Sequence, residues 1–505
     1  MMQLLHISEP RLLFDHGQTM EDPRDGITLF GPLDQEKVIG IRAGVIGTAA
    51  GIERFTRWVR TIQAPVVPGA NPNARPLFPG FEAAFRVPWN PQPVLTRTID
   101  EAELNNRLHV ADKYQRVYQT VDLFAEAIIA AAKTEEMAPD VWVVVVPDDV
   151  YRYCRPQSNV EVALQVKPAT KLSRREARNL QRSPSLFGDV NKAAESYSYD
   201  AHFHNQLKAR LLVHRITTQI VRESTIAYRD FLNVYNEPKR NLDAVVSDIA
   251  WTLSSSIFYK AGGRPWKLDG VREGVCYVGI VFKKDDRNED ARFSCCAAQM
   301  FLDSGDGVVF RGAVGPWYSP ETRDYHLDRD AARELVALAV ASYREITSRA
   351  PRELFLHGRI RFSDDEWAGF SDAVDIASTN LVGVRIRQAS DIKLFRNGKM
   401  PPLRGVAYVE NDARAYLWTK GYIPRLLTYP GREVPNPVMV EVCRGTAPIE
   451  TVVQDVLALT KLNYNSCVFG DGDPVTLIFA DAIGEILTAG PLAAGAPPLP
   501  FKFYI

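Results

Sequence analysis

The spacing of apolar residues along the first half of the chain predicts a layered α/β unit. The stretch 38–63 (VIGIRAGVIGTAAGIERFTRWVRTIQ) predicts a strand, a glycine-rich turn and a helix. The stretch 105–133 places apolar residues on one face of a helix. VWVVVVP (141–147) is an almost unbroken apolar run, as is typical of a strand buried on both faces of a parallel sheet. Strand, helix and strand in this order predict a doubly wound arrangement.

A second α/β pattern follows an amphipathic helix over 242–263, which ends at two glycines. CYVGIVF (276–282) predicts a strand, and 293–312 predicts a hairpin around a Gly-Asp-Gly turn. The remaining predicted elements are, in chain order, a helix over 331–346, strands over 353–360, 381–387, 415–424 and 437–443, and a helix over 449–463. Two α/β halves are therefore expected, and they meet near 265–275.

Residues 166–196 interrupt this pattern with a polar, basic stretch. Its cations lie among Ser, Asn, Gln and Pro; they are Lys167, Lys171, Arg174, Arg175, Arg178 and Arg182. Two interpretations stand: a solvated loop or linker, or an arm that contacts nucleic acid or a protein partner.

Composition excludes several classes of protein. The chain has 505 residues, with 60 Lys and Arg against 61 Asp and Glu, so no bulk positive charge favours indiscriminate binding to nucleic acid or membranes. No apolar run approaches the roughly 20 residues that span a bilayer, and the N-terminal stretch does not resemble a secretory signal. The six cysteines form no CxxC pair, which favours a reduced, cytoplasmic compartment.

Two local motifs favour structural interpretations. GVIGTAAG (44–51) follows a strand as a phosphate-binding loop would, but its spacing matches neither the dinucleotide fingerprint nor the P-loop. Close packing of a strand-to-helix turn explains these glycines better. His16 and His357 are interpreted as structural histidines, because no Ser-His-Asp or Cys-His arrangement is visible.

Four polar residues form a candidate anion site. His204 and Lys208 lie four residues apart, so they share one helix face; Gln219 follows across a turn. Lys260 ends the amphipathic helix. Two cations, an amide and an imidazole can converge on a terminal phosphate, although ordinary surface placement is the alternative.

The second half lacks the carboxylates that a two-metal nuclease of the ribonuclease H type needs. Val281 stands at the centre of the first strand, where such an enzyme carries an aspartate, and FLHGRI brings only His357, Gly358 and Arg359. The acidic residues nearby are expected in solvated turns; they are Asp285, Asp286 and those of SDDEW (363–367). The apolar end LPFKFYI is expected to be buried, with a cation beside its carboxylate.

Taken together, several segments make the chain resemble the short prokaryotic Argonautes over its whole length. They are DHGQTMEDPRDGITLFGPL (15–33), FHNQLKARLL (203–212), TQIVREST (218–225), YKAGGRPWKL (259–268), FLHGRIRFSDDEW (355–367), LTKLNYNSCVFGDGDPVTLIFADAIGEIL (459–487) and FYI at the end. The resemblance implies a Rossmann-like MID domain with an N-terminal extension over 1–268. It implies a ribonuclease-H-like PIWI domain over 269–505.

The resemblance also assigns roles to individual residues. His204, Lys208, Gln219 and Lys260 match the family's pocket for the 5′-phosphate of a guide strand. A Mg²⁺ ion is implied between that phosphate and the carboxylate of Ile505. Val281, Gly358 or Arg359, and Asp481 fall at catalytic positions of cleaving Argonautes, and only Asp481 is acidic. The resemblance therefore implies a PIWI domain that does not cut.

The subgroup that the chain resembles most pairs with a TIR-APAZ protein. This implies guide RNA, a single-stranded DNA target and, as a defence against plasmids and phages, activation of a partner that depletes NAD. A heterodimer is implied, with higher assembly on activation. A SIR2-APAZ or an APAZ-linked nuclease partner stays an alternative. Another is an autonomous nuclease built from Asp285, Asp286, Asp364, Asp365 and Asp481.

Overall fold

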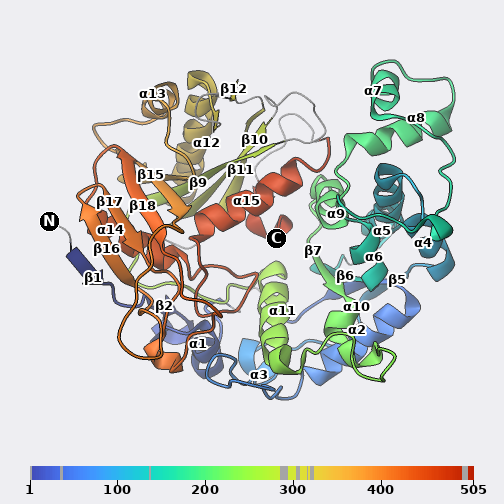
Figure 1. Ribbon diagram of the computed structural model, residues 1–505, viewed down its shortest axis with the longest axis horizontal. Helices are drawn as coiled ribbons and strands as arrows, with labels where there is room; N and C mark the ends of the chain where they lie inside the picture. Colours follow the sequence, from blue (N-terminus) through green and yellow to red (C-terminus); the bar gives the residue numbers. More distant parts are fainter. Residues whose placement is uncertain are drawn as a thin grey trace.

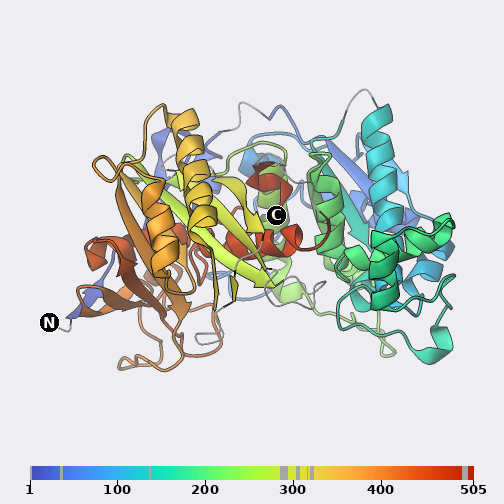
Figure 2. The ribbon, with the colours of Figure 1, turned by 90° about the horizontal axis from the view of Figure 1, so that it is seen from above.

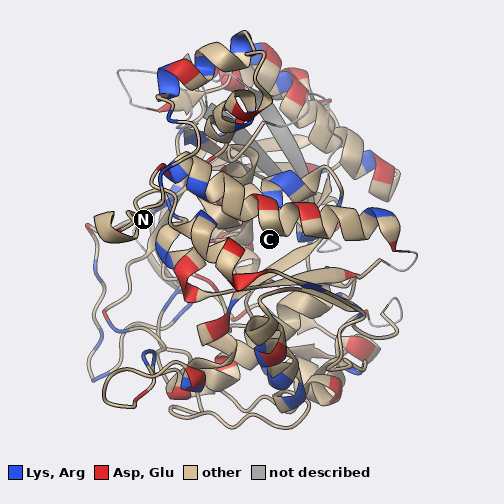
Figure 3. Ribbon diagram, turned by 90° about the vertical axis from the view of Figure 1, so that its right-hand side faces the viewer, with Lys and Arg blue, Asp and Glu red and all other residues tan. Residues whose placement is uncertain are grey.

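The computed structural model describes residues 3–34, 38–135, 138–284, 294–302, 307–314, 317–318, 324–491 and 499–505, with side chains outside 284–323. Two lobes lie on either side of the C-terminal residues (Figure 1), and the view from above shows the same division (Figure 2). Basic and acidic residues are interspersed along the helices of the side seen in Figure 3, as the near-zero net charge leads one to expect.

The first lobe is built on a parallel four-stranded sheet in the order β5-β4-β6-β7. Its strands are β4 (Ala43–Gly47), β5 (Leu95–Thr98), β6 (Val141–Val146) and β7 (Thr218–Arg222). β6 is buried at every position because helices cover both faces of the sheet. One face packs against α2 (Ala49–Thr61) and α11 (Val246–Lys260). The other packs against α5 (Lys113–Thr134) and α9 (Phe203–Leu212), which gives a Rossmann-like domain.

The second lobe contains a ten-stranded sheet in the order β1-β16-β17-β18-β15-β14-β9-β10-β11-β19. Its strands are β1 (Gln3–His6), β9 (Val275–Lys284), β10 (Ser294–Leu302), β11 (Gly307–Val314), β14 (Glu353–Gly358), β15 (Asn380–Gln388), β16 (Val406–Asn411), β17 (Arg414–Leu417), β18 (Val438–Arg444) and β19 (Leu499–Pro500). β9, β14 and β15 are parallel, and β10 and β11 are antiparallel to their neighbours. This is the strand order of ribonuclease H, so the predicted fold class is confirmed.

Helices cover both faces of this second sheet. α12 (Arg329–Thr347) and α13 (Asp364–Asp372) pack on one face. α14 (Ile449–Leu459) and α15 (Val475–Leu487) pack on the other. The remaining described helices and short strands are β2 (Leu12–Leu13), β3 (Thr19–Met20), α1 (Pro23–Phe30), α3 (Phe81–Phe85), α4 (Glu101–Leu108), α6 (Asp148–Tyr153), α7 (Arg174–Arg182), α8 (Gly188–Glu195), α10 (Glu223–Ile226), β8 (Lys267–Leu268), β12 (Trp317–Tyr318) and β13 (Tyr325–His326).

The N-terminal residues do not all belong with the first lobe. The resemblance places residues 1–268 in the first domain, yet β1 pairs with β16 at the edge of the second sheet. β2 pairs with both β3 and β8, which fastens the N-terminal stretch to the junction between the lobes. A sheet edge offers unpaired backbone groups to any nearby extended segment, and local sequence does not show which segment takes them.

The basic segment 166–196 is helical rather than a loop. α7 and α8 form a hairpin, and Ser173 with Glu176 makes a capping box at the start of α7. Tyr197, just after α8, stacks on Tyr114 and donates a hydrogen bond to Asp112 Oδ2 at 2.7 Å. The loop interpretation is therefore wrong, while contact with nucleic acid or a partner is untested.

The glycines of 44–51 act in packing, as predicted. A Cβ at Gly47 would lie 2.7 Å from the carbonyl oxygen of Val145 on the neighbouring strand. Thr48 caps α2 by accepting a hydrogen bond from Gly51 N at 3.0 Å. The expected helix 105–133 is divided into α4 and α5, because Asp112 caps the start of α5. Of the expected Gly-Asp-Gly turn, Gly305 and Asp306 lie outside the described residues.

The two histidines interpreted as structural differ from each other. His16 is exposed and has a positive φ of 54°, so a structural role in the core is wrong for it. His357 is buried, and its Nδ1 lies 3.0 Å from Thr476 Oγ1. Among the described residues, no helix is both long and apolar enough to cross a membrane.

Candidate functional site

A cavity of about 540 Å³ lies where the two lobes meet. Its walls come from α9 and β7 of the first lobe, from α15 of the second, and from the C-terminal residues Tyr504 and Ile505 (Figure 1). Most of the lining is apolar, and its polar side chains come from several separate segments. A cavity between two domains with a few converging polar groups is the usual form of a ligand site.

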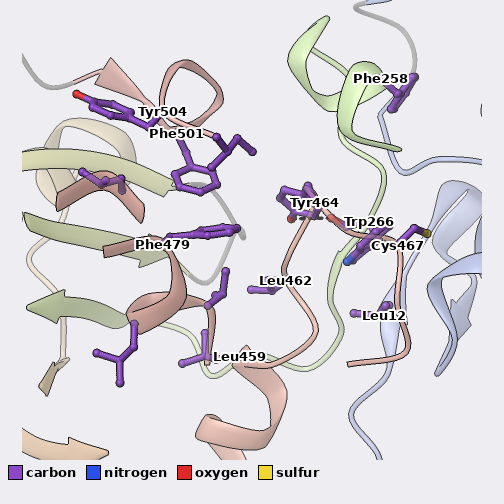
Figure 4. Close-up of a cluster of buried hydrophobic side chains, with 14 of the residues drawn as sticks. Leu12, Phe258, Trp266, Leu459, Leu462, Tyr464, Cys467, Phe479, Phe501 and Tyr504 are labelled. Atoms are coloured by element: carbon purple, nitrogen blue, oxygen red, sulfur yellow. Dashed lines mark hydrogen bonds between the residues drawn. The ribbon is translucent and has the colours of Figure 1, made fainter. Parts of the chain in front are cut away.

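The C-terminal residues are held in place by aromatic packing. Phe501 is 2% exposed and stacks on Phe479 of α15, with ring centroids 3.6 Å apart (Figure 4). Tyr504 and Ile505 are buried as well, as the apolar sequence of this stretch predicts. This packing carries Ile505 into the wall of the cavity.

The C-terminal packing allows a stability test. Replacing Phe501 by Ala should lower the free energy of unfolding by about 3–5 kcal/mol, because it empties a buried aromatic site. The same change should weaken anion binding at the cavity by releasing Ile505. Urea denaturation followed by circular dichroism measures the first effect. Phe501→Leu is the matched control and should cost less than half as much. A variant Phe501→Ala as stable as the wild type would contradict this packing.

His204 presents its ring to the cavity from the first turn of α9. The side chain is exposed to the cavity, and its Nδ1 lies 3.1 Å from Asn205 Oδ1. The surrounding protein and then the charge of Lys208 lower the pKa of His204 to about 3. The imidazole is therefore neutral near pH 7 and offers an aromatic face rather than a charge.

Lys208 lies one helical turn further and is buried behind the cavity wall. Its side chain is 2% exposed, and Nζ donates to Thr218 O at 3.3 Å and to the backbone oxygen of Ile505. Burial lowers the pKa of Lys208 to about 7, because the protein interior solvates an ammonium poorly. The helix places Lys208, and packing of the C-terminal residues brings Ile505 to it.

Gln219 and Lys260 meet on the other side of the same site. Lys260 Nζ donates to Gln219 Oε1 at 2.6 Å, and Ser256 Oγ donates to the same oxygen at 2.8 Å. Ser256 Oγ also lies 2.9 Å from Asn465 Oδ1, which competes for the same hydroxyl proton. Lys260 is 1% exposed, and burial together with the charge of Lys208 lowers its pKa well below the usual value for lysine.

The structure thus gathers all four predicted residues and Ile505 around one cavity. His204 and Ile505 line it. Lys208 contacts the lining residue Ile505, and Gln219 and Lys260 connect to the lining residue Asn465 through Ser256. Lys208 donates to the main-chain oxygens of Thr218 and Ile505, and Lys260 donates to the side-chain amide oxygen of Gln219. None of these acceptors is a side-chain carboxylate. Within the described part of the chain neither buried lysine has a side-chain carboxylate partner. Burying such cations is costly, so the arrangement favours an anionic ligand.

Sequence reasoning missed several residues of this cavity. Tyr151 of α6 lines the cavity, and the guanidinium carbons of Arg155 and Arg222 lie 3.3 Å and 4.1 Å from its ring centroid. Further polar lining residues that the sequence did not reveal are His202, Asn205, Thr225, Asn463, Asn465 and Glu485. Tyr151 and Arg155 are four positions apart and His202 is two from His204, but no spacing joins these segments to Arg222, Asn465 or Glu485.

The expected catalytic positions of the second lobe form an ion-pair network. Val281 is buried on β9, Gly358 ends β14, and Arg359 follows it. Arg359 Nη2 lies 2.9 Å from Asp473 Oδ2 and 3.3 Å from Asp481 Oδ2. Lys283 Nζ lies 3.1 Å from Asp481 Oδ1. Asp481 is therefore paired with two cations, and Asp473 is a member that the sequence did not reveal.

The acidic residues proposed for an autonomous nuclease do not gather within the described part of the chain. Asp364 is the first residue of α13, on the other face of the sheet from Asp481 on α15, and it pairs with Arg444. Asp285 and Asp286 lie outside the described residues. Among those that the structure describes, no three His, Cys, Asp or Glu side chains form a group that could hold a metal ion.

Comparison with solved structures finds this architecture in Argonautes. Clostridium butyricum Argonaute, in a structure with a guide DNA and a 19-mer target DNA, matches all of this chain with a TM-score of 0.67 and 13% identity. The fold is that of the MID and PIWI half of an Argonaute. The chain spans 55% of that protein, about half its length.

Two further structures support the same fold. A. aeolicus Argonaute matches 99% of the chain with a TM-score of 0.54 and 13% identity, and Drosophila Piwi matches 99% with 0.56 and 12%. The chain covers 54% and 56% of these proteins. No protein-family model matches the sequence, and no curated protein matches it. At such low identity the likeness establishes the fold, and the ligand has to be argued from the site.

Proposed function

We propose that this chain is a guide-binding, target-recognition subunit that anchors a 5′-phosphorylated guide RNA and pairs it with single-stranded DNA. The observation that carries the proposal is the pair of buried lysines, Lys208 and Lys260, behind the wall of the interlobe cavity. A terminal phosphate would be the negatively charged partner of these two ammonium groups. Clostridium butyricum Argonaute binds a guide DNA and a target DNA in its solved structure, which supports nucleic acid as the ligand class.

Each residue of the site has a distinct role in this proposal. Lys208 and Lys260 neutralise the phosphate, and Gln219 holds Lys260 through the 2.6 Å hydrogen bond. The neutral ring of His204 offers a stacking face for the first base. The cavity of about 540 Å³ is much larger than a phosphate, so it has room for the nucleotide attached to it.

The proposal includes Mg²⁺ beside the phosphate. Mg²⁺ prefers hard oxygen ligands and often binds through one or two carboxylates together with substrate phosphates. The backbone oxygen of Ile505 and the amide oxygen of Gln219 are ligands of this type in the site. In the guide-free protein both oxygens accept hydrogen bonds from Lys208 and Lys260, so the ion binds them only when the phosphate draws these ammonium groups away. Such an ion would offset part of the charge that the phosphate brings.

We further propose that the second lobe does not cut the target. Arg359 lies between Asp473 and Asp481, and Lys283 also pairs with Asp481. These cations take up the carboxylate oxygens that a divalent ion would need, and Val281 offers none. The lobe then holds the paired strands by their backbones while base pairing supplies specificity.

The proposed effector is a separate TIR-APAZ protein whose NAD hydrolysis is activated by target pairing. A SIR2-APAZ or an APAZ-linked nuclease would fulfil the same role. The genes beside this one discriminate among the three. In each case the paired target must favour the active assembly over the inactive one.

A single assay tests both binding and the absence of cleavage. The isolated protein, loaded with a 5′-phosphorylated guide RNA, should retain a labelled complementary DNA and leave it intact in Mg²⁺ and in Mn²⁺. A scrambled DNA is the control and should not be retained. Cleavage at a fixed distance from the guide end would overturn the non-cutting assignment, and failure to retain the complementary DNA would overturn target recognition.

A further inference from the structure

A second cavity, of about 240 Å³, opens on the surface of the second lobe. Its walls come from the segment 394–402, which precedes β16, and from the segment 429–434, which precedes β18. β16 and β17 lie on the side of the second lobe that is turned away from the first lobe (Figure 1). None of the residues that line this second-lobe hollow lines the interlobe cavity, so it is a separate candidate site.

The second-lobe hollow is held in shape by contacts within and between its two segments. Lys393 Nζ donates to Val434 O at 2.9 Å, which fastens one segment to the other. Arg396 Nε donates to Met400 O at 3.1 Å, and its guanidinium carbon lies 4.9 Å from the ring centroid of Tyr422. A ligand does not have to order a site that is already formed, so binding costs less conformational entropy.

Positive charge without acidic partners surrounds the second-lobe hollow. Four cations line it or lie beside it: Lys393, Arg396, Lys399 and Arg432. Within the described part of the chain, none of the four forms an ion pair with a carboxylate, whereas Arg425 on the same stretch pairs with Asp25. Glu433 alone is acidic among the described residues of the lining. The hollow therefore has an excess of positive charge on a chain whose net charge is -1.

Apolar side chains form the rest of the wall and remain open to solvent. Phe395 is 72% exposed and Met400 is 41% exposed, and both line the hollow. Pro401, Pro402 and Leu394 complete the apolar part of the lining. Single exposed apolar residues are common on protein surfaces, but a group of them around one hollow marks a binding surface. Aromatic residues, methionine and arginine are also the types enriched in protein–protein interfaces.

We propose that the second-lobe hollow binds an acidic segment of a protein partner. An apolar side chain of the partner enters the hollow, and the partner's carboxylates pair with the surrounding cations. A nucleic-acid strand fits less well, because single-strand sites follow the backbone along a groove with aromatic stacking faces. Here the cations surround one hollow whose walls are largely aliphatic and proline. This inference goes beyond the proposed function and does not depend on guide binding or on which effector is present.

A labelled acidic peptide tests the site directly. The probe is fluorescein-Gly-Asp-Glu-Asp-Phe-Asp-Glu-Asp-Gly, titrated with the full chain and followed by fluorescence anisotropy. The wild type should bind it, and the affinity should fall as salt rises from about 0.05 M to about 0.5 M, because exposed charges are screened. Alanine in place of the peptide's phenylalanine should weaken binding about 10-fold, since the apolar anchor is lost. A peptide with lysine at every acidic position should not bind.

Variants then assign the binding to this hollow. Lys399→Ser with Arg432→Ser should weaken peptide binding about 10-fold, because two exposed charge contacts are lost. Met400→Ser should reduce the preference for the phenylalanine peptide over the alanine peptide. These side chains are exposed, so the melting temperatures should stay unchanged. The matched control is Lys171→Ser with Arg182→Ser, which removes one exposed lysine and one exposed arginine from the first lobe and should leave the affinity unchanged.

Three results would overturn the inference. The first is no binding of the acidic peptide by the wild type at low salt. The second is an equal loss of affinity in both double variants, which would show general charge attraction. The third is tighter binding of an oligothymidine of equal charge that Lys399→Ser with Arg432→Ser abolishes, which would assign the hollow to nucleic acid. Guide affinity tests the proposed function separately, and it should be the same in this double variant and in the wild type.

Discussion

Replacing both buried lysines by methionine should lower the affinity for a 5′-phosphorylated guide more than 100-fold. Each charge-assisted contact to a phosphate contributes about 1.5–3 kcal/mol, and Lys208 and Lys260 are two such contacts. The double variant should nevertheless fold, because methionine fills a similar volume without a buried charge. Its melting temperature without guide should equal or exceed that of the wild type. Fluorescence anisotropy with labelled guides measures the affinity, and calorimetry measures the stability.

Two controls separate the phosphate contact from general effects. A guide with a 5′-hydroxyl should bind the double variant and the wild type about equally, because it never uses the two ammonium groups. Lys133→Met, at an exposed lysine near the end of α5, should leave both affinities unchanged. Undiminished affinity of the double variant for the phosphorylated guide would show that the phosphate binds elsewhere.

Guide binding should weaken steeply above pH 7 and should take up protons. Burial lowers the pKa of Lys208 to about 7 and that of Lys260 well below the usual value, so both amines lose charge in the guide-free protein as the pH rises. A bound phosphate favours the ammonium forms, so it raises both pKa values and draws protons from solution. The affinity should fall about tenfold per pH unit for each proton taken up. Below about pH 6 it should fall again, because a phosphate monoester then loses its second charge.

The free energy of unfolding of the guide-free protein should increase with pH over the range in which the guide affinity falls. A lysine whose pKa is lower in the folded than in the unfolded protein leaves the unfolded chain with more bound protons between pH 7 and 10. The contribution of Lys208 to the free energy of unfolding should therefore increase over that range. Titration calorimetry in buffers of different ionisation enthalpy counts the protons taken up with the guide, and Lys208→Met should take up fewer. A constant affinity from pH 7 to 9, with no dependence on the buffer, would contradict the buried-cation site.

The sequence by itself determined most of the elements and part of the site. The spacing of apolar residues predicted β6, α11 and the order of strands and helices, because each element must bury an apolar face. Helical spacing placed His204 and Lys208 on one face, and the missing carboxylate at Val281 was visible directly. The helices of 166–196 were missed, because a strongly polar stretch has no apolar period to reveal them.

Only the tertiary structure decided which distant residues meet. Ile505 reaches Lys208 across 297 positions because Phe501 packs on α15, and such packing is not encoded in any local spacing. The pairing of β1 with β16 likewise joins residues 3–6 to residues 406–409 in one sheet. Glu485 and His202 line one cavity because α15 of the second lobe packs against α9 of the first. Local sequence determines whether a segment forms a helix or a strand. The burial of apolar surface between elements determines which of them pack together.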